Sequence, residues 1–483
     1  MPSETLRHYI NGAPVEPRGQ ERMPVYNPAT GAVLSEIVLD DTGAVHAAVE
    51  AAQRAFPGWS STPIMERARV MFRFRELLER HRRELAASIT EEHGKTLDDA
   101  YAEMGRGIEV VELAASAPSL LKGEVLTDVA HGVDVELMRV PLGVVAGLTA
   151  FNFPGMIPLW MFPIALVAGN TFILKPSERT PRTPMKVAAL AAEAGLPAGV
   201  LNVVHGGSAV AEALLTHPDI RAVSFVGSQP VAEHVYRTAA AHGKRVQALG
   251  GAKNFHVVMP DCDLDYTVRA LVNSGYGSAG ERCLACAVIL AVGSIQDPLV
   301  DALRRAGDAL RVGPGSEEGV EMGPLIRPEH RERVRRYIAK GVEEGARIIR
   351  DGRRDVLPSE GFFLGPTLFD HVTPEMAIAR EEIFGPVLSV IRVPDLETAV
   401  QVANRSPFGN TTSIYTRSGA AARYFREHIQ AGMVGINIGV AAPVAIFPFS
   451  GWKTSFYGDL HATGRDGYLF YTETRVVTSR WPS

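Results

Sequence analysis

The segment Leu271–Val288, LVNSGYGSAGERCLACAV, contains a cysteine that could carry covalent chemistry, Cys283, after a run of small residues. Glycines in this run allow the backbone to fold closely around a small substrate and to present its amide N–H groups. These amides could stabilise the oxyanion formed when the thiol attacks a carbonyl carbon. The neighbouring Arg282 is expected to favour the reactive thiolate. The alternative is a buried, unreactive cysteine at a glycine-rich turn.

Polar side chains follow three predicted strands. Asn152, in AFNFP, could donate an amide hydrogen to an oxyanion without titrating. Lys175 and Glu178, in LKPSE, combine a cation with a carboxylate that could accept from both ribose hydroxyls of a dinucleotide, which favours NAD over NADP. Gly227 and Ser228, in FVGS, precede a predicted helix whose first amides could bind a pyrophosphate. The structural alternatives are a turn-forming Asn, an exposed ion pair and an ordinary helix N-cap.

Hydrophobic periodicity predicts the elements that position these groups. Helical patterns, with apolar residues three and four positions apart, cover Ala44–Phe56, Arg67–Glu91 and Thr96–Leu121. In residues 141–226 short apolar strands alternate with helices, which is typical of a doubly wound parallel sheet. Such sheets bind ligands at the carboxyl ends of their strands, where the three polar groups are expected to lie.

A second α/β domain is predicted after the Gly250-Gly251 pair, where strand and helix patterns resume. The α/β fold class is therefore expected to consist of two doubly wound domains. Residues 1–122 and 142–248, with part of 450–470, are predicted to form a dinucleotide-binding domain. Residues 249–449 are predicted to form the catalytic domain.

Two further segments, 123–141 and 471–483, have the alternating pattern of β-strands. They are expected to pair with each other or with another subunit. Together they would add a small β element for oligomerisation.

Composition places the chain among ordinary globular proteins, with 483 residues, 46% apolar residues, 21% charged residues and a net charge of −5. Scattered basic residues argue against nucleic-acid or membrane binding. Three cysteines, Cys262, Cys283 and Cys286, favour a reducing compartment and a cytoplasmic location. The CxxC pair has no partner motif for zinc, so no metal is expected, although a redox pair stays an alternative. The longest apolar run, Met156–Ala168, is too short to span a bilayer.

The chemistry-bearing motifs occur in a fixed order along nearly the whole chain: FNFP at 151–154, KPSE at 175–178, FVGS at 225–228, LGG at 249–251, GERC at 280–283 and EIFGPV at 382–387. In this combination the chain resembles the aldehyde dehydrogenase superfamily. It is most similar to the CoA-acylating methylmalonate-semialdehyde dehydrogenases. That closer similarity lies in GSAGERC at 277–283, VVMPD at 257–261 and the ending from 451 to 474.

The resemblance implies a role for each matching residue. Cys283 would be the nucleophile and Asn152 the oxyanion donor. The residues that would contact NAD are Phe151, Lys175, Glu178, Gly227, Ser228, Gly250, Glu382 and Phe384. Arg106 and Arg282 match two active-site arginines, and a planar guanidinium can bind a substrate carboxylate bidentately. From its helical pattern alone, Arg106 could instead be a helix-surface charge.

One position departs from the hydrolytic members of the superfamily. They carry Glu directly before LGG, where it activates water, whereas this chain has Ala248. Without that base the acyl-enzyme is expected to resist hydrolysis and to wait for a stronger nucleophile, such as the thiol of CoA. The alternative is that another carboxylate supplies the base.

The sequence therefore predicts an NAD-dependent, CoA-acylating enzyme that oxidises and decarboxylates methylmalonate or malonate semialdehyde to propionyl-CoA or acetyl-CoA. The resemblance also implies a homotetramer built from dimers. Phe255 and the loop 440–446 depart from the family pattern, which affects the identity of the aldehyde more than the reaction. Two alternatives are a hydrolytic NAD-dependent aldehyde dehydrogenase acting on another small aldehyde, and a catalytically inactive binding protein.

Overall fold

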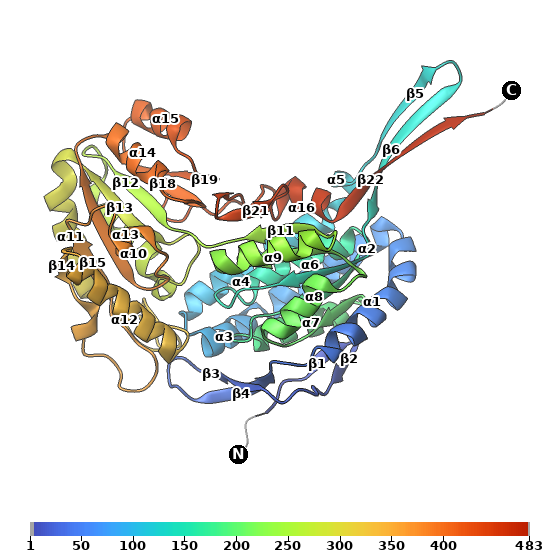
Figure 1. Ribbon diagram of the computed structural model, residues 1–483, viewed down its shortest axis with the longest axis horizontal. Helices are drawn as coiled ribbons and strands as arrows, with labels where there is room; N and C mark the ends of the chain where they lie inside the picture. Colours follow the sequence, from blue (N-terminus) through green and yellow to red (C-terminus); the bar gives the residue numbers. More distant parts are fainter. Residues whose placement is uncertain (1–3, 482–483) are drawn as a thin grey trace.

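Within residues 4–481, which the computed structural model describes, the strands form two large sheets and three smaller ones (Figure 1). In the first large sheet the inner strands β9, β8, β7, β10 and β11 run parallel, and the edge strands are antiparallel. In spatial order its strands are β2 (Ala13–Val15), β1 (His8–Ile10), β9 (Leu201–Val203), β8 (Thr171–Lys175), β7 (Val144–Leu148), β10 (Ile220–Val226), β11 (Arg245–Leu249) and β21 (Phe456–Gly458).

The second large sheet is parallel except for the edge strand β14. In spatial order its strands are β14 (Arg347–Arg350), β15 (Thr367–Asp370), β16 (Val387–Val393), β13 (Cys286–Val292), β12 (Asn254–Val258), β18 (Thr411–Tyr415) and β19 (Met433–Ile436). Buried hydrophobic residues between 255 and 429 form its own core. The α/β fold class is thus confirmed, while the predicted domain boundaries stay a prediction.

Helices cover both large sheets (Figure 1). Those of the first sheet are α1 (Gly43–Ser61), α2 (Ile64–Arg80), α3 (Arg82–His93), α4 (Leu97–Ala115), α5 (Ala117–Leu120), α6 (Met156–Val167), α7 (Arg182–Glu193), α8 (Ser208–Thr216), α9 (Gln229–Ala241) and α16 (Gly464–Phe470). Those of the second are α10 (Leu264–Tyr276), α11 (Gln296–Ala309), α12 (Pro328–Glu343), α13 (Ala377–Arg380), α14 (Leu396–Asn404) and α15 (Gly419–His428). None of the helices within 4–481 is long and apolar enough to cross a membrane.

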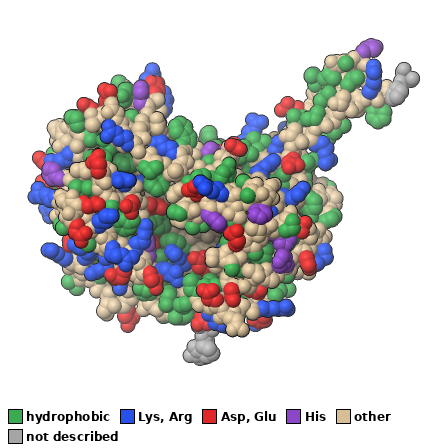
Figure 2. All heavy atoms as spheres, viewed as in Figure 1, with side chains coloured by type: hydrophobic (Ala, Val, Ile, Leu, Met, Phe, Trp, Pro, Cys, Tyr) green, Lys and Arg blue, Asp and Glu red, His purple; other side chains and the backbone are tan. Residues whose placement is uncertain are grey.

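The three-stranded sheet β22-β6-β5 projects from the body of the molecule (Figure 1). Its strands are β5 (Glu124–Ala130), β6 (Val133–Pro141) and β22 (Thr472–Arg480), and β22 pairs antiparallel with β6 of the same chain. Side chains such as Val125, Leu126 and Val476 are exposed on it, and Figure 2 shows hydrophobic side chains along this arm. Both predicted strand segments therefore form, and they pair with each other. Residues 482–483 of that prediction lie outside the described part.

Two predicted helices are each divided in the structure. The predicted helix Arg67–Glu91 is interrupted at His81, where φ is −94° and ψ is 7°. Arg82 donates to the Tyr101 carbonyl and stacks on the Tyr101 ring, so α3 starts in contact with α4. The predicted helix Thr96–Leu121 ends as α4 at Ala115, because Pro118 has no N–H to continue the ladder.

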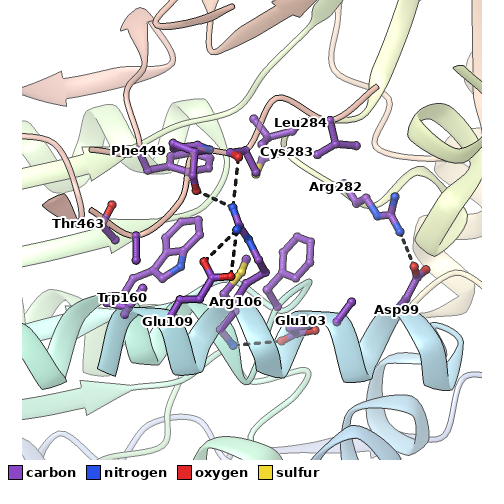
Figure 3. A pocket seen from close by; sticks show the side chains of 18 of the residues that line it. Asp99, Glu103, Arg106, Glu109, Trp160, Arg282, Cys283, Leu284, Phe449 and Thr463 are labelled. Atoms are coloured by element: carbon purple, nitrogen blue, oxygen red, sulfur yellow. Dashed lines mark hydrogen bonds and ion pairs between the residues drawn. The ribbon is translucent and has the colours of Figure 1, made fainter. Parts of the chain in front are cut away.

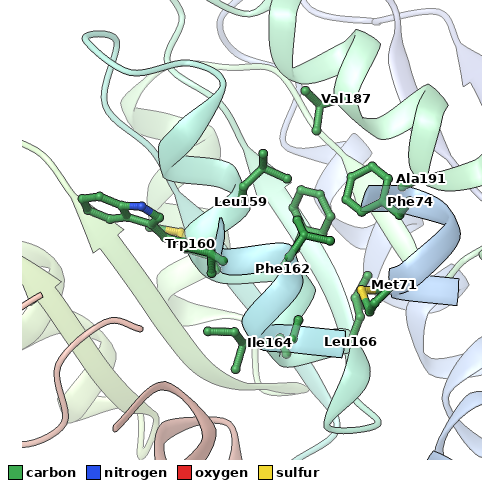
Figure 4. Close-up of a cluster of buried hydrophobic side chains, with 14 of the residues drawn as sticks. Met71, Phe74, Leu159, Trp160, Phe162, Ile164, Leu166, Val187 and Ala191 are labelled. Atoms are coloured by element: carbon green, nitrogen blue, oxygen red, sulfur yellow. The ribbon is translucent and has the colours of Figure 1, made fainter. Parts of the chain in front are cut away.

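Helix α6 is the centre of the first core. Every residue of α6 is buried, which explains why its sequence is apolar on all sides. Side chains of α2, α6 and α7 interdigitate there, including Phe74 and Phe162 (Figure 4). Helix α6 begins at Met156, four residues after Asn152, and its packing therefore holds the segment that contains Asn152.

The buried Arg67 provides a test of this core. Its guanidinium donates to the carbonyls of Ser60, Thr62 and Val167 and so joins α1, α2 and α6. Arg67→Met leaves these carbonyls without their donor, and we expect a loss of about 2–4 kcal/mol of stability. Thermal unfolding at a fixed scan rate measures the fall in Tm. Arg69→Met, at an exposed position of the same helix, is the control and is expected to unfold near the wild-type temperature.

Candidate active site

A strained turn precedes Cys283. The turn Gly277–Gly280 follows α10, and both Ser278 and Ala279 have left-handed backbone angles, with φ of 50° and 53°. Such angles cost energy in residues with a Cβ and persist only when neighbouring contacts hold them. On the other side of the thiol, the Cys283 carbonyl accepts from the side-chain amides of Asn254 at 2.9 Å and Asn410 at 3.0 Å. The backbone of Cys283 is therefore fixed from both sides.

Asn152 lies next to this segment. Its side-chain Nδ2 donates to the carbonyl of Glu281 at 3.0 Å, two residues before the cysteine. The Asn152 backbone carbonyl in turn accepts from Lys95 Nζ, which also pairs with Glu103 at 2.7 Å. An amide nitrogen carries two hydrogens, so one remains for an oxyanion bound at the thiol. The structure thus brings Asn152 and the Cys283 segment together, as their predicted roles require.

The expectation that Arg282 favours the thiolate is wrong. Burial, followed by the nearby Glu382 charge, raises the pKa of Cys283 to about 12. The Arg282 guanidinium is turned away toward Asp99, with Nη2 to Oδ1 at 2.7 Å, and toward Ser278 Oγ at 3.2 Å. Arg282 is next to Cys283 in the chain, but this did not reveal that its guanidinium points away from the thiol. Arg282 instead stabilises the turn before the cysteine.

A cavity of about 450 Å³ opens beside Cys283 (Figure 3). Its apolar lining residues include Phe153, Met156, Trp160, Val440 and Phe449. Its charged lining residues are Asp99, Glu103, Arg106, Glu109 and Arg282. All acidic lining residues come from α4, whereas the loop 440–446 contributes the apolar residues Val440, Ala442, Pro443 and Ala445.

Both predicted carboxylate-binding arginines line this cavity, and each already has an acidic partner. Arg106 Nη1 donates to both carboxylate oxygens of Glu109, at 2.9 and 3.2 Å. Its Nη2 donates to the carbonyls of Ala442 and Pro443 in the rim loop. Arg282 is held by Asp99 as described above. Sequence analysis missed both acidic partners, although the i,i+3 spacing of Arg106 and Glu109 is a readable signal.

The position of Ala248 bears on water activation. Its methyl group is fully buried in the core between β11 and the helices on one face of the first sheet. Other carboxylates near the thiol already accept hydrogen bonds: Asp99 from Ser278 and Arg282, Glu103 from Lys95, Gly155 and Met156, Glu109 from Arg106, Glu281 from Ile326, and Glu382 from Ala252. Each of these carboxylates accepts at least one hydrogen bond, although the buried Oε2 of Glu281 has no donor within residues 4–481.

The predicted dinucleotide contacts lie at the carboxyl ends of parallel strands. Lys175 ends β8, is buried, and pairs with Glu178 at 3.7 Å. The Lys175 cation holds the pKa of Glu178 below its usual range despite desolvation. Ser228 begins α9 after Gly227, and its hydroxyl makes no capping bond to the helix. Phe151 lies three residues after the carboxyl end of β7, at the same edge of the sheet.

The segment with Glu382 and Phe384 approaches from the second sheet. Glu382 Oε1 accepts from the Ala252 N–H at 2.8 Å, directly after Gly250-Gly251, and burial raises the pKa of Glu382. Phe384 has a φ of 59° and its ring lies edge-on to Phe151 at 5.8 Å. His330 of α12, another residue that sequence analysis missed, donates to the Phe384 carbonyl at 2.6 Å. Residues from both sheets therefore meet at this edge.

No cluster of three or more His, Cys, Asp or Glu side chains able to hold a metal ion occurs in the described part of the chain. Cys262, Cys283 and Cys286 are all free thiols.

A parallel-sheet fold with a cavity at a partly buried cysteine is typical of an α/β enzyme with a thiol nucleophile. The sequence model of the aldehyde dehydrogenase family matches residues 15–477. The chain belongs to the aldehyde dehydrogenase family and is an aldehyde dehydrogenase.

Several proteins of similar length are similar to this chain over nearly their whole length. The chain is 54% identical to malonate-semialdehyde dehydrogenase 2 of Geobacillus kaustophilus, over 99% of both chains. The methylmalonate-semialdehyde dehydrogenase structure from Oceanimonas doudoroffii superposes with a TM-score of 0.98 at 52% identity, covering 99% of both chains. A Sinorhizobium meliloti protein assigned as a methylmalonate-semialdehyde dehydrogenase, complexed with NAD, gives a TM-score of 0.98 at 48% identity, covering 100% of this chain and 99% of that one.

The raised pKa of Cys283 predicts its reactivity in the ligand-free protein. Below a thiol pKa the thiolate fraction rises about tenfold per pH unit, so alkylation of Cys283 by iodoacetamide should still rise steeply above pH 9.5. An ordinary cysteine is half ionised at its usual pKa of about 8.5 and levels off about one pH unit higher. Mass spectrometry of the Cys283 peptide measures the rate at each pH. A plateau below pH 9 would contradict the raised pKa.

Proposed function

We propose that the protein is an NAD-dependent, CoA-acylating malonate- or methylmalonate-semialdehyde dehydrogenase. The observation that carries the proposal is the buried methyl group of Ala248 where hydrolytic relatives have a base, in a site whose other carboxylates are already hydrogen-bonded. The names of the similar curated and solved proteins support the substrate class.

The residues at the strand ends fit NAD. A carboxylate and a buried ammonium, Glu178 and Lys175, are suited to ribose hydroxyls, and the free Ser228 hydroxyl and first amides of α9 are suited to a pyrophosphate. A Cβ at Gly227 would collide with the Phe225 ring, so glycine at this position leaves room for that ring. When bound, NAD supplies the hydride acceptor. The solved NAD complex of a 48% identical protein supports this assignment.

The protein's own groups account for the chemistry at the aldehyde. In the proposed reaction Cys283 gives its thiol proton to solvent water, and Sγ forms a bond to the carbonyl carbon. The resulting oxyanion accepts from the Asn152 side chain and the Cys283 backbone N–H. Loss of hydride gives a thioester. Overall, malonate semialdehyde, CoA and NAD⁺ yield acetyl-CoA, carbon dioxide and NADH, and the methyl-substituted substrate yields propionyl-CoA.

The fate of the thioester follows from the missing base. Water is a weak nucleophile and needs a carboxylate that can accept its proton. At 248 no such group exists, and the carboxylates around the cavity are engaged with cations or amides. A thiol is intrinsically a much stronger nucleophile than water. CoA is therefore the proposed acyl acceptor.

The proposed assembly is a homotetramer built from dimers. The projecting sheet β22-β6-β5 exposes apolar side chains, including Val125 at 66% and Leu126 at 65%. Exposed apolar surface on a projecting element is typical of a protein interface. Three free cysteines are consistent with the proposed cytoplasmic location.

The first assay is NADH formation from malonate semialdehyde with and without CoA, with mass identification of the acyl product. We expect sustained turnover only with CoA and acetyl-CoA as the product, because the thioester lacks a base for hydrolysis. Equal turnover without CoA and release of a free acid would favour the hydrolytic alternative.

The assignment of Cys283 as the nucleophile can be tested with Cys286, three residues further on, as a matched control. Cys283→Ala removes the attacking sulfur, and we expect turnover to fall by at least about a thousandfold while NAD binding persists. Cys286→Ala, at the buried second position of the CxxC pair, should keep most of the activity. Steady-state rates and NAD titration of both variants measure the two effects. Residual activity of Cys283→Ala near the wild-type level would overturn the assignment of the nucleophile.

A further inference from the structure

The two arginines in the cavity are held very differently. Arg282 bonds to Asp99, to Ser278 Oγ and to the Asn273 carbonyl, and its side chain is only 12% exposed. A Cβ at Gly277 would collide with this guanidinium, so the group lies flat against the turn. Moving Arg282 toward a ligand would release the strained turn before Cys283. Arg282 is therefore fixed by the fold.

Arg106 is held only at the cavity rim. It is 32% exposed, and its partners are Glu109 on the same helix and two carbonyls of the loop 440–446. Ion pairs between residues one helical turn apart and open to solvent are weak. The Arg106 guanidinium can therefore change partners without disturbing the nucleophile.

Glu109 is also distinct among the acidic lining residues. Asp99 is held by two side chains, and Glu103 by Lys95 and two backbone amides. The hydrogen bonds of the Glu109 side chain within residues 4–481 come from Arg106 alone. Figure 3 shows Glu109 beside Arg106 on α4, facing the cavity. Its carboxylate thus occupies the guanidinium face that a substrate carboxylate would need.

We propose that Glu109 is a specificity-determining residue that competes with the substrate carboxylate for Arg106. The inference rests on the proposed function, because it concerns a semialdehyde that carries a carboxylate. A charged substrate must displace Glu109 and then lies close to its negative charge, which weakens binding. An uncharged aldehyde does not compete for Arg106, and the Arg106–Glu109 pair has no net charge, so binding of this aldehyde is not weakened. Glu109 therefore reduces the preference of the site for carboxylated aldehydes.

The test compares malonate semialdehyde with propanal, an uncharged aldehyde of the same chain length. We expect Glu109→Gln to raise the ratio of their kcat/KM values about three- to tenfold, mainly through a lower KM for malonate semialdehyde. Glu109→Met removes the same charge and should have the same effect. The inhibition constant of malonate against propanal should fall by a similar factor.

The matched control is Glu112→Gln, which removes one negative charge from the same helix. Glu112 pairs with Arg75 outside the cavity, at 2.9 Å, so the selectivity ratio should stay at the wild-type value. An unchanged or lower ratio in both Glu109 variants, or an equal rise in Glu112→Gln, would overturn the inference. If the wild type does not form a CoA thioester, the proposed function fails, but the malonate inhibition constants against propanal still decide the role of Glu109.

Discussion

The ion pair between Asp99 and Arg282 is the contact on which the site depends. Asp99 lies in the first turn of α4, which covers the first sheet, and Arg282 precedes the cysteine in the unit built on the second sheet. The pair spans 2.7 Å and Ser278 donates to the other oxygen of the same carboxylate. It therefore holds a left-handed turn that would otherwise relax, and it fixes the nucleophile segment relative to the helix that forms the cavity wall.

This arrangement leaves the cavity almost neutral. Acidic and basic groups line it, but each charge is paired: Arg282 with Asp99, Lys95 with Glu103 and Arg106 with Glu109. A carboxylate paired with a cation is a weaker base for water because the cation stabilises its charged form. Burial at the same time raises the pKa of Cys283, which favours the protonated thiol in the ligand-free protein. In the proposed reaction the first effect would disfavour hydrolysis of the thioester, and the second would limit reactions of the free thiol.

Sequence reasoning placed the strands, their polar carboxyl ends and the Cys283 turn, because these depend on local periodicity and on residues adjacent in the chain. It failed where a contact joins distant segments. Asp99 and Arg282 are 183 residues apart, so nothing local reveals that the guanidinium turns away from the thiol. The break at His81 was missed because the apolar pattern continues on the same face through α2 and α3. In contrast, Arg106 and Glu109 are three residues apart and their pairing could have been predicted.

In the loop after β11, Gly251 lies against the Glu382 side chain, which comes from the unit built on the second sheet. A side chain on Gly251 would collide with the carboxylate of Glu382, which accepts from the next amide, Ala252 N–H. Glycine there leaves room for the Glu382 carboxylate. Glu382 stays close enough to raise the pKa of Cys283, yet its bond to Ala252 directs it onto the backbone. The loop that follows Ala248 and the end of β11 therefore binds the carboxylate of Glu382 through its backbone.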